Sequence, residues 1–366
     1  MVDDDDLDAA VTEGIVSQQQ ADALRTFAAS RRPTAARPHE ERFRFMRGFN
    51  DFFFTVGVAL VGAALIHFST QNPVGNLIAA AVIAAAIIWM LAELLVRRMR
   101  LVLPGILLTC FFVYFVFQAA DAGWSQFVGS PPRLIRTTLK ELFLQNSTPG
   151  ALLAKLGAVA ATASLFYWRF RLPFALLPIA ASLVAAAMIA AAALPQRPDA
   201  PFVVAAVYLL CGFLVFAAAM AYDMSDPDRV TRRADCAFWL HLLAAPIIVH
   251  SLIGMVSPVS LYNRVDLTAQ VAWSVVGIVA ALTVVALIVD RRALFVSALS
   301  YLGIVIGYAI TGAGSGDSTN IFFATLLILG VMVLVLGIGW QPLRNIVMRA
   351  LPGTVARHLP PAAVRA

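Results

Sequence analysis

The stretch from position 75 to position 96 reads GNLIAAAVIAAAIIWMLAELLV and carries a single ionisable residue, Glu93. A helix crosses the hydrocarbon core of a bilayer with roughly 20 consecutive apolar residues. This run is long enough, and it lacks the alternation of polar and apolar residues that marks a membrane barrel strand. It therefore predicts a transmembrane helix.

The composition of the whole chain extends that prediction. Of its 366 residues, 60% are apolar and 13% are charged, whereas a soluble domain carries about a quarter charged residues. The same criterion of length predicts spans at 51–68, 75–96, 101–119, 151–168, 172–193, 201–222, 236–256, 268–289, 293–312 and 319–340. We expect an all-α, polytopic transmembrane helix bundle of about ten spans.

Arginine and lysine indicate the orientation of the bundle. Of the 27 such residues, 21 lie in the N-terminal segment, the C-terminal tail and every second connection between spans, and the other connections hold six. Short loops rich in these residues stay in the cytoplasm. Both termini are therefore predicted to be cytoplasmic.

The sequence divides into three predicted parts. Residues 1–48 form a cytoplasmic helical hairpin, linker and interfacial anchor, 49–341 the membrane domain, and 342–366 a basic cytoplasmic tail. In the hairpin a first helix ends at Gly14, and Ser17 with Gln20 has the capping-box pattern that starts a second. So small a unit cannot hold a core of its own. We expect it to dock on the bundle, on itself or on a protein partner.

The chain opens with the acidic run Asp3–Asp6 and not with a basic segment leading into an apolar core. We therefore expect no cleaved signal peptide, and the first apolar span stays in the mature protein.

A basic and aromatic segment precedes the first span. Arg42, Arg44 and Arg47 alternate there with aromatic or apolar residues, a pattern that binds anionic lipid head groups at a membrane surface. The net charge of +6 could also suggest nucleic acid, but the cations fall in short clusters between apolar runs. We therefore expect membrane lipids, and no nucleic acid, as partners.

The longest outer connection contains a further candidate helix. Residues near 131–145 place apolar side chains at helical spacing, with charged residues elsewhere on the wheel. This pattern predicts an amphipathic helix on the outer membrane surface, either as a connector or as a lid over an outward cavity.

Three histidines lie within predicted spans, where ionisable groups are costly. His67 and His250 fall at similar depth in the outer part of the membrane and could approach one another, whereas His241 lies toward the cytoplasm. His241 and His250 are nine residues apart, about 180° around a helix, so they cannot bind one metal ion together. They are either hydrogen-bonded core residues or parts of a metal, haem or proton site completed by other helices.

Glu93 is the one carboxylate that the predicted spans place well inside the membrane. Arg97 follows four residues later, in the favourable order for a helix salt bridge, so a structural pair and a proton-coupling site both remain open. Pro246 sits between His241 and His250, where it removes a backbone donor and predicts a kink. Such breaks often line cavities in transporters.

A mixed-charge cytoplasmic loop, beginning at Asp223, precedes the seventh span. It would be explained by solvated salt bridges, or by binding of a substrate head group or a partner. Its candidate binding residues are Arg229, Arg232, Arg233 and Asp235.

The sequence holds no nucleophile elbow, HExxH zinc pair, CxxC pair or Walker sequence. Cys110, Cys211 and Cys236 lie in or beside apolar runs without metal or redox spacing, as small buried hydrophobes do. We therefore assign no catalytic residue and no metal site, name no cofactor, and do not expect an enzyme.

The run from Glu13-Gly14-Ile15 through Ser17 and Gln20 to Ala23-Leu24, followed by Arg44 to Asp51 and paired apolar spans, resembles bacterial predicted membrane proteins of unknown function. The segment from Asp226-Pro227-Asp228-Arg229 to His250 is similar to uncharacterised alphaproteobacterial membrane proteins. The resemblance implies a multi-pass protein of the bacterial inner (plasma) membrane. Since that family has no assigned reaction, it carries over no catalytic residue.

Two functions remain open. The first is a transporter or permease for a small molecule or lipid, with a cavity near Pro246, His250 and His67. The second is a non-catalytic scaffold or accessory protein that recruits a partner through the hairpin and the charged loop; a lipid-modifying enzyme is a third. A polar cavity at membrane depth would favour transport, and a tightly packed interior would favour the scaffold.

Overall fold

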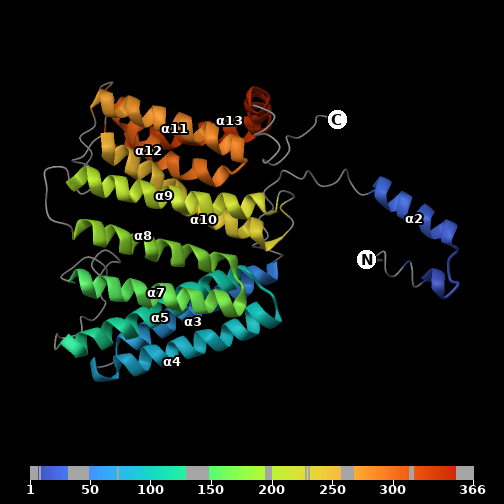
Figure 1. Ribbon diagram of the computed structural model, residues 1–366, viewed down its shortest axis with the longest axis horizontal. Coiled ribbons are helices and arrows are strands. Elements are labelled where there is room, and N and C mark those ends of the chain that lie inside the picture. Colours follow the sequence, from blue (N-terminus) through green and yellow to red (C-terminus); the bar gives the residue numbers. More distant parts are fainter. Residues whose placement is uncertain are drawn as a thin grey trace. The chain divides into compact units, whose positions relative to one another are not determined.

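A computed structural model describes Leu7 and residues 10–31, 49–71, 74–128, 148–193, 200–226, 229, 231–256, 268–312 and 317–351. All regular structure among these residues is helical, as Figure 1 shows. The chain divides into two compact units, one of residues 1–41 with 361–366 and one of residues 42–360.

The first unit contains helix α2 (Gln18–Arg31). Its predicted capping box is present, because the Ser17 N–H donates to Gln20 Oε1 at 2.9 Å and the Gln20 N–H donates to Ser17 Oγ at 3.2 Å. Gly14 has a φ of +74° in the turn before α2, a conformation that glycine adopts without steric cost. On α2, Ala21 is buried and Leu24 is exposed.

The second unit is the helix bundle. Its helices are α3 (Phe49–Thr70), α4 (Val74–Ala92), the π-helical turn η1 (Glu93–Arg98), α5 (Leu103–Val128), α7 (Pro149–Phe170), the 3-10 turn η2 (Pro173–Ala175), α8 (Leu176–Ala192), α9 (Ala200–Met224), α10 (Arg232–Val256), α11 (Ala269–Val289), α12 (Arg292–Gly312) and α13 (Ser318–Ala350). Each predicted span overlaps a helix of this bundle.

The described residues hold nine helices that are long and apolar enough to cross a membrane. Helix α12 is not among these nine, because its described apolar stretch is only Tyr301–Thr311. The chain is thus a multi-pass helical membrane protein, while the count of ten spans and the orientation stay predictions.

The last helix is longer than the sequence suggested. Helix α13 continues to Ala350, so the predicted boundary at 341 falls inside it. Arg344, placed in the tail by the sequence, is fully buried in the bundle. The residues of the predicted outer-surface helix (131–145) and of the basic anchor (Arg42, Arg44 and Arg47) lie outside the described residues.

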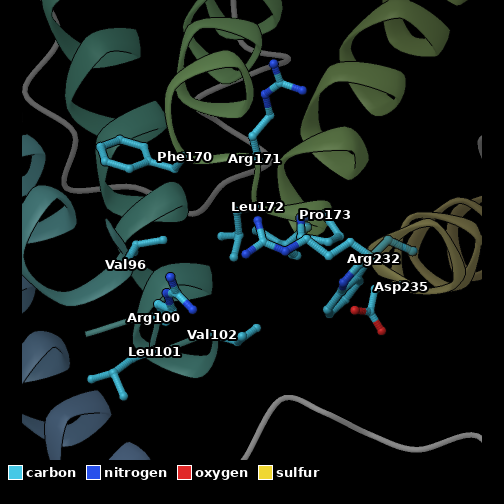
Figure 2. Close-up of a pocket in the computed structure, with 12 residues that line it drawn as sticks. Val96, Arg100, Leu101, Val102, Phe170, Arg171, Leu172, Pro173, Arg232 and Asp235 are labelled. Atoms are coloured by element: carbon cyan, nitrogen blue, oxygen red, sulfur yellow. The ribbon is translucent and has the colours of Figure 1, made fainter. Parts of the chain in front are cut away.

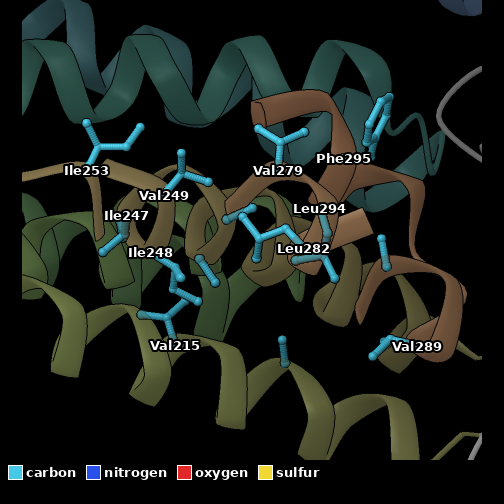
Figure 3. Close-up of a cluster of buried hydrophobic side chains, with 14 of the residues drawn as sticks. Val215, Ile247, Ile248, Val249, Ile253, Val279, Leu282, Val289, Leu294 and Phe295 are labelled. Carbon is cyan, nitrogen blue, oxygen red and sulfur yellow. The ribbon is translucent and has the colours of Figure 1, made fainter. Parts of the chain in front are cut away.

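The buried side chains of the bundle form two hydrophobic clusters. The first joins α3, α4, α5 and α7 and includes Ile88, Phe115 and Phe166. The second joins α8 to α13 around α10 and includes Val249 and Leu282, as Figure 3 shows. In Figure 1, α3, α4, α5 and α7 lie on one side of the bundle and α11, α12 and α13 on the other.

Helices α9 and α10 approach each other closely at Gly212. A Cβ atom at this position would lie 2.8 Å from Ile248 Cγ1 and 3.0 Å from Ile247 Cγ2. Since real Cβ atoms are not found this close to such atoms, a larger residue would push the two helices apart. The glycine therefore sets the distance between α9 and α10.

Four connections, after η1, α7, α9 and α11, turn at one end of the bundle. Each contains a non-glycine residue with positive φ, namely Arg100 (56°), Arg171 (52°), Arg229 (54°) or Asp290 (56°). In three of the four connections the next residue along the chain is buried, namely Leu101, Leu172 or Arg291. We call this end of the bundle, defined by residues 97–102, 169–174, 223–235 and 289–292, the basic end.

Candidate functional site

Asp223 organises one half of a buried ionic network at the basic end. This carboxylate lies in the last turn of α9 and is buried. Its Oδ2 atom lies 2.9 Å from His241 Nε2 and accepts a hydrogen bond from Arg291 Nε at 3.2 Å. Arg291 Nη2 also bonds to Asp223 Oδ1 and donates to the Ala234 carbonyl at 3.2 Å. A carboxylate, an imidazole and a guanidinium from three segments thus meet in the interior.

Asp290 organises the other half. Its Oδ1 atom accepts a hydrogen bond from the Trp340 indole N–H at 2.9 Å and lies 3.6 Å from Arg344 Nε. Arg229 donates to the carbonyls of Val289 and Asp290, both at 3.0 Å, and its Nη1 atom lies 3.6 Å from Asp290 Oδ2. Asp290 therefore connects the α9–α10 connection with the end of α11 and with α13.

The backbone at the end of α11 makes this arrangement possible. Asp290 adopts a left-handed conformation, and the N–H groups of Asp290 and Arg291 both reach the Ala286 carbonyl. Aspartate tolerates this conformation better than most side chains. Because the connection to α12 is so short, two consecutive residues enter the interior and bind different partners. We call Asp223, Arg229, His241, Asp290, Arg291, Trp340 and Arg344 the buried network.

His241 is the member of this network with proton chemistry. A carboxylate only accepts hydrogen bonds, so the Nε2 atom facing Asp223 must carry a hydrogen. The Nδ1 atom is buried and has no hydrogen-bond partner among the described residues. The ring also packs edge-on against Phe216, with centroids 5.2 Å apart. The imidazole is therefore oriented by Asp223 and presents Nδ1 as a possible proton acceptor.

Glu93 forms a second, more exposed ionic group at the basic end. The predicted pair with Arg97 is present, with Nη1 3.3 Å from Oε2. Arg169 of α7 also binds Glu93, with Nη2 2.7 Å from Oε1 and 2.9 Å from Oε2. The side chain of Glu93 is 30% exposed. This geometry links η1 to α7 and agrees with a structural role.

A pocket of about 170 Å³ lies at the basic end, between the connection after η1, the connection from α7 to η2 and the start of α10. Its cationic residues are Arg100, Arg171 and Arg232, and Asp235 is its one carboxylate. Its remaining lining is apolar or aromatic: Val96, Leu101, Val102, Phe170, Leu172, Pro173, Phe174 and Trp239. Figure 2 shows the side chain of Arg232 extending toward Leu172, whereas the side chain of Arg171 points away from Leu172.

The structure does not bring His67 and His250 together. His67 is exposed on α3, with its ring against Phe68 at a centroid distance of 5.8 Å. His250 is half-buried, and its Nδ1 atom lies 2.7 Å from the Tyr301 hydroxyl of α12. Neither histidine lines the pocket described above. The outer cavity between them stays a prediction.

The mixed-charge loop before the seventh span is shorter than the sequence suggested. Asp223 belongs to α9, and Arg232, Arg233 and Asp235 belong to α10. Arg229 enters the buried network, while Arg232 and Asp235 line the pocket. Arg233 is exposed and lines neither site. The candidate residues of this segment thus separate into buried, pocket-lining and surface positions.

Helix α10 runs without interruption through Pro246. The residues on either side, Ala245 and Ile247, are buried in the second hydrophobic cluster. The kink at Pro246 stays a prediction.

Several functional candidates were missed by the sequence reading. Asp121 lies within α5, beyond the predicted end of the third span, and pairs with Lys155 of α7. Glu93 is therefore not the only carboxylate within a spanning helix. Asp290 has no predicted role, Arg291 is predicted only as one of the cations that indicate orientation, and Arg344 is predicted to lie in the tail. The sequence does contain one indication of the role of Asp290. This residue lies directly between an apolar run and two arginines, where an acid can pair with a neighbouring cation.

The three cysteines differ in burial. Of the predicted buried cysteines only Cys236 is buried; Cys211 is intermediate and Cys110 is exposed, because a helix facing lipid need not bury an apolar residue. Across the described ranges, no three His, Cys, Asp or Glu residues gather as a metal site would require.

Comparison with family models, with curated proteins and with solved structures gave no match to this chain.

Proposed function

We propose that the protein is a proton-coupled permease for a small molecule or lipid, with His241 and Asp223 as its coupling pair. The observation that carries this proposal is the imidazole of His241, held by a buried carboxylate and with its second nitrogen unbonded among the described residues. Ionisable groups within membrane helices are costly and are commonly retained for ion or proton pathways.

The contacts around the pair support a coupling role. Asp223 is shared between His241 and Arg291, so protonation of the imidazole changes the charge balance at a carboxylate that joins three segments. Arg291 also bonds to the Ala234 carbonyl of α10. A change in the protonation of His241 therefore alters the electrostatic contacts among α9, α10 and the α11–α12 connection.

Reconstituted protein tests the proposal. Purified full-length chain is placed in liposomes with an imposed pH gradient, and a panel of organic acids, amines, sugars and short-chain phospholipids is added. We expect one solute class to drive proton movement, read by a pH-sensitive dye, and His241→Gln to abolish it. Glutamine keeps a donor for Asp223 but does not titrate.

His250→Gln is the matched control on the same helix. It should retain most of the flux, because His250 is bonded to Tyr301 and not to the network. Flux that survives in His241→Gln, or no coupled solute in the panel, would reject the assignment. Flux lost only in His250→Gln would transfer the pathway to the outer half of the bundle.

The membrane and orientation form part of the same proposal. Positive residues concentrated at the basic end support its location in the cytoplasm, and the resemblance described above supports a bacterial inner membrane. A cysteine introduced at Gln145, in an outer connection, should react in intact cells with an impermeant thiol reagent. Protection of that cysteine would reverse the orientation.

A scaffold or accessory protein is the second candidate. The observation that favours it is the packing of α10, where Ala244, Ala245, Val249 and Ser251 have no exposed surface. The first unit, with exposed Ile15 and Leu24, would recruit a protein partner. In-cell photocrosslinking from position 24 tests this idea, and crosslinks confined to the chain itself would count against it.

A further inference from the structure

We propose that the pocket at the basic end binds the phosphate head group of an anionic phospholipid. The site is formed by Arg100, Arg232 and the apolar wall between them, with Arg171 at its margin. It is separate from the buried network, and it does not depend on the protein being a permease.

The arginines of this pocket differ from the arginines that hold the bundle together. Arg169, Arg229, Arg291 and Arg344 each face a carboxylate at short distance. Within the described part of the chain, no ion pair or hydrogen bond is recorded for the guanidinium groups of Arg100, Arg171 or Arg232. Three cations that line one pocket with a single carboxylate leave it electropositive. Such a site favours an anion.

The apolar and aromatic lining of the pocket indicates which class of anion binds there. Leu101, Leu172 and Phe170 line the pocket and are otherwise buried, and Phe174 packs edge-on against Trp239 with centroids 4.8 Å apart. Apolar and aromatic surface beside a cationic group suits a molecule that is charged at one end and apolar at the other. A fully hydrated inorganic ion would gain nothing from this wall.

The volume limits how much of the ligand enters. The pocket has a volume of about 170 Å³. Drug-sized ligands occupy pockets of about 300–1,000 Å³. The available space therefore suits a phosphodiester and its nearest atoms, with the acyl chains left outside the pocket.

The position of the pocket agrees with a lipid as the source. Arg100 lies between η1 and α5, Arg171 ends α7, and Arg232 begins α10, so all three stand where spanning helices end. Head groups of the surrounding bilayer occupy this level. Basic pockets between membrane helices recognise anionic head groups in this way, and arginine matches the geometry of phosphate oxygens.

Native mass spectrometry of the delipidated full-length protein in mild detergent tests the proposal. Phosphatidylglycerol, phosphatidylcholine and water-soluble glycerol phosphate are titrated separately. We expect one phosphatidylglycerol to bind at least tenfold more tightly than either other ligand. The variant Arg100→Gln/Arg232→Gln should weaken that binding by at least about tenfold, which corresponds to 1.4 kcal/mol.

The matched control is Arg98→Gln/Arg233→Gln. It removes the same charge from neighbouring exposed positions that do not line the pocket, and its affinity should stay within about threefold of the unmodified protein. A third variant, Val102→Phe, narrows the pocket without changing charge and should also weaken binding. Melting temperatures in detergent verify that all variants are folded.

Three results would overturn the proposal. Equal weakening in the two double variants would indicate a diffuse field instead of a pocket. Equal affinity for phosphatidylcholine would remove the role of charge, and equal affinity for glycerol phosphate would indicate a soluble phosphate as the ligand.

Discussion

Two sets of arginines, at the basic end and in the neighbouring part of α13, differ in burial and in ion pairing. Arg229, Arg291 and Arg344 have nearly buried side chains and are paired with Asp223 or Asp290. Arg100, Arg171 and Arg232 are exposed and line a pocket. The same residue type serves in one case to hold helices together and in the other to present charge. The difference teaches that arginine clusters in membrane proteins need not be topology signals alone.

Removing a carboxylate from the buried network is the strongest challenge to this comparison. Asp290→Asn keeps a residue that tolerates positive φ but removes the negative charge that faces Arg229 and Arg344. We expect a loss of about 3–5 kcal/mol in the free energy of unfolding, as for other buried pairs that lose one partner. Denaturant unfolding in mild detergent measures it. Asp317→Asn, at an exposed position before α13, should change stability by less than about 0.5 kcal/mol.

The distance between α9 and α10 provides the next test, because these helices carry Asp223 and His241. Gly212→Ala should cost about 1–3 kcal/mol, since the added methyl group collides with Ile248. Gly277→Ala in α11 is the control, because a Cβ there meets nothing within 4 Å. It should be neutral or stabilising by up to ~1 kcal/mol. Equal stability of the two variants would contradict close packing at Gly212.

The indole hydrogen bond to Asp290 should have a smaller effect. Trp340→Phe removes this donor but keeps an aromatic ring near Arg292, whose guanidinium lies 5.5 Å from the ring centroid. We expect a loss of about 1–2 kcal/mol, measured by thermal melting. Trp273→Phe, on a 75% exposed side chain, should leave the melting temperature nearly unchanged. A loss at Trp273 as large as that at Trp340 would argue against the bond.

Substitution of an arginine that lines the pocket should have the smallest effect on stability. Arg171→Gln replaces an exposed guanidinium for which no partner is recorded in the described ranges, so the free energy of unfolding should change by less than about 0.5 kcal/mol. The same denaturation assay applies. A loss above 2 kcal/mol would mean that the pocket arginines are structural after all, and the contrast between the two sets would disappear.

The positions of the helices could be predicted from the sequence because each needs only a local property. An apolar run such as 75–96 is long enough to span a bilayer wherever it packs, and the Ser17–Gln20 capping box depends on residues three apart. The Glu93–Arg97 pair is local in the same sense. These predictions required no knowledge of neighbouring helices.

The buried network could not be predicted in this way, since its contacts join residues far apart in the chain. Arg291 reaches back 68 positions to Asp223, and Trp340 reaches 50 positions to Asp290. In sequence, Asp290 and Arg291 look like the charged turn between two spans. Only the left-handed backbone at Asp290 and the short connection turn both side chains inward. The predicted approach of His67 to His250 rests on similar depth alone, and equal depth in a membrane does not make two helices neighbours.

The chain order of the buried network has a consequence for biosynthesis. During translation α9 and α10 emerge before Arg291 exists, so Asp223 has only His241 to bind until the α11–α12 connection is made. Asp290 in turn lacks Trp340 and Arg344 until α13 is complete. The last helix thus closes the charge balance of the bundle. A chain truncated before Trp340 would carry an incompletely neutralised acid in its interior, a defect by which membrane quality control could distinguish unfinished molecules from finished ones.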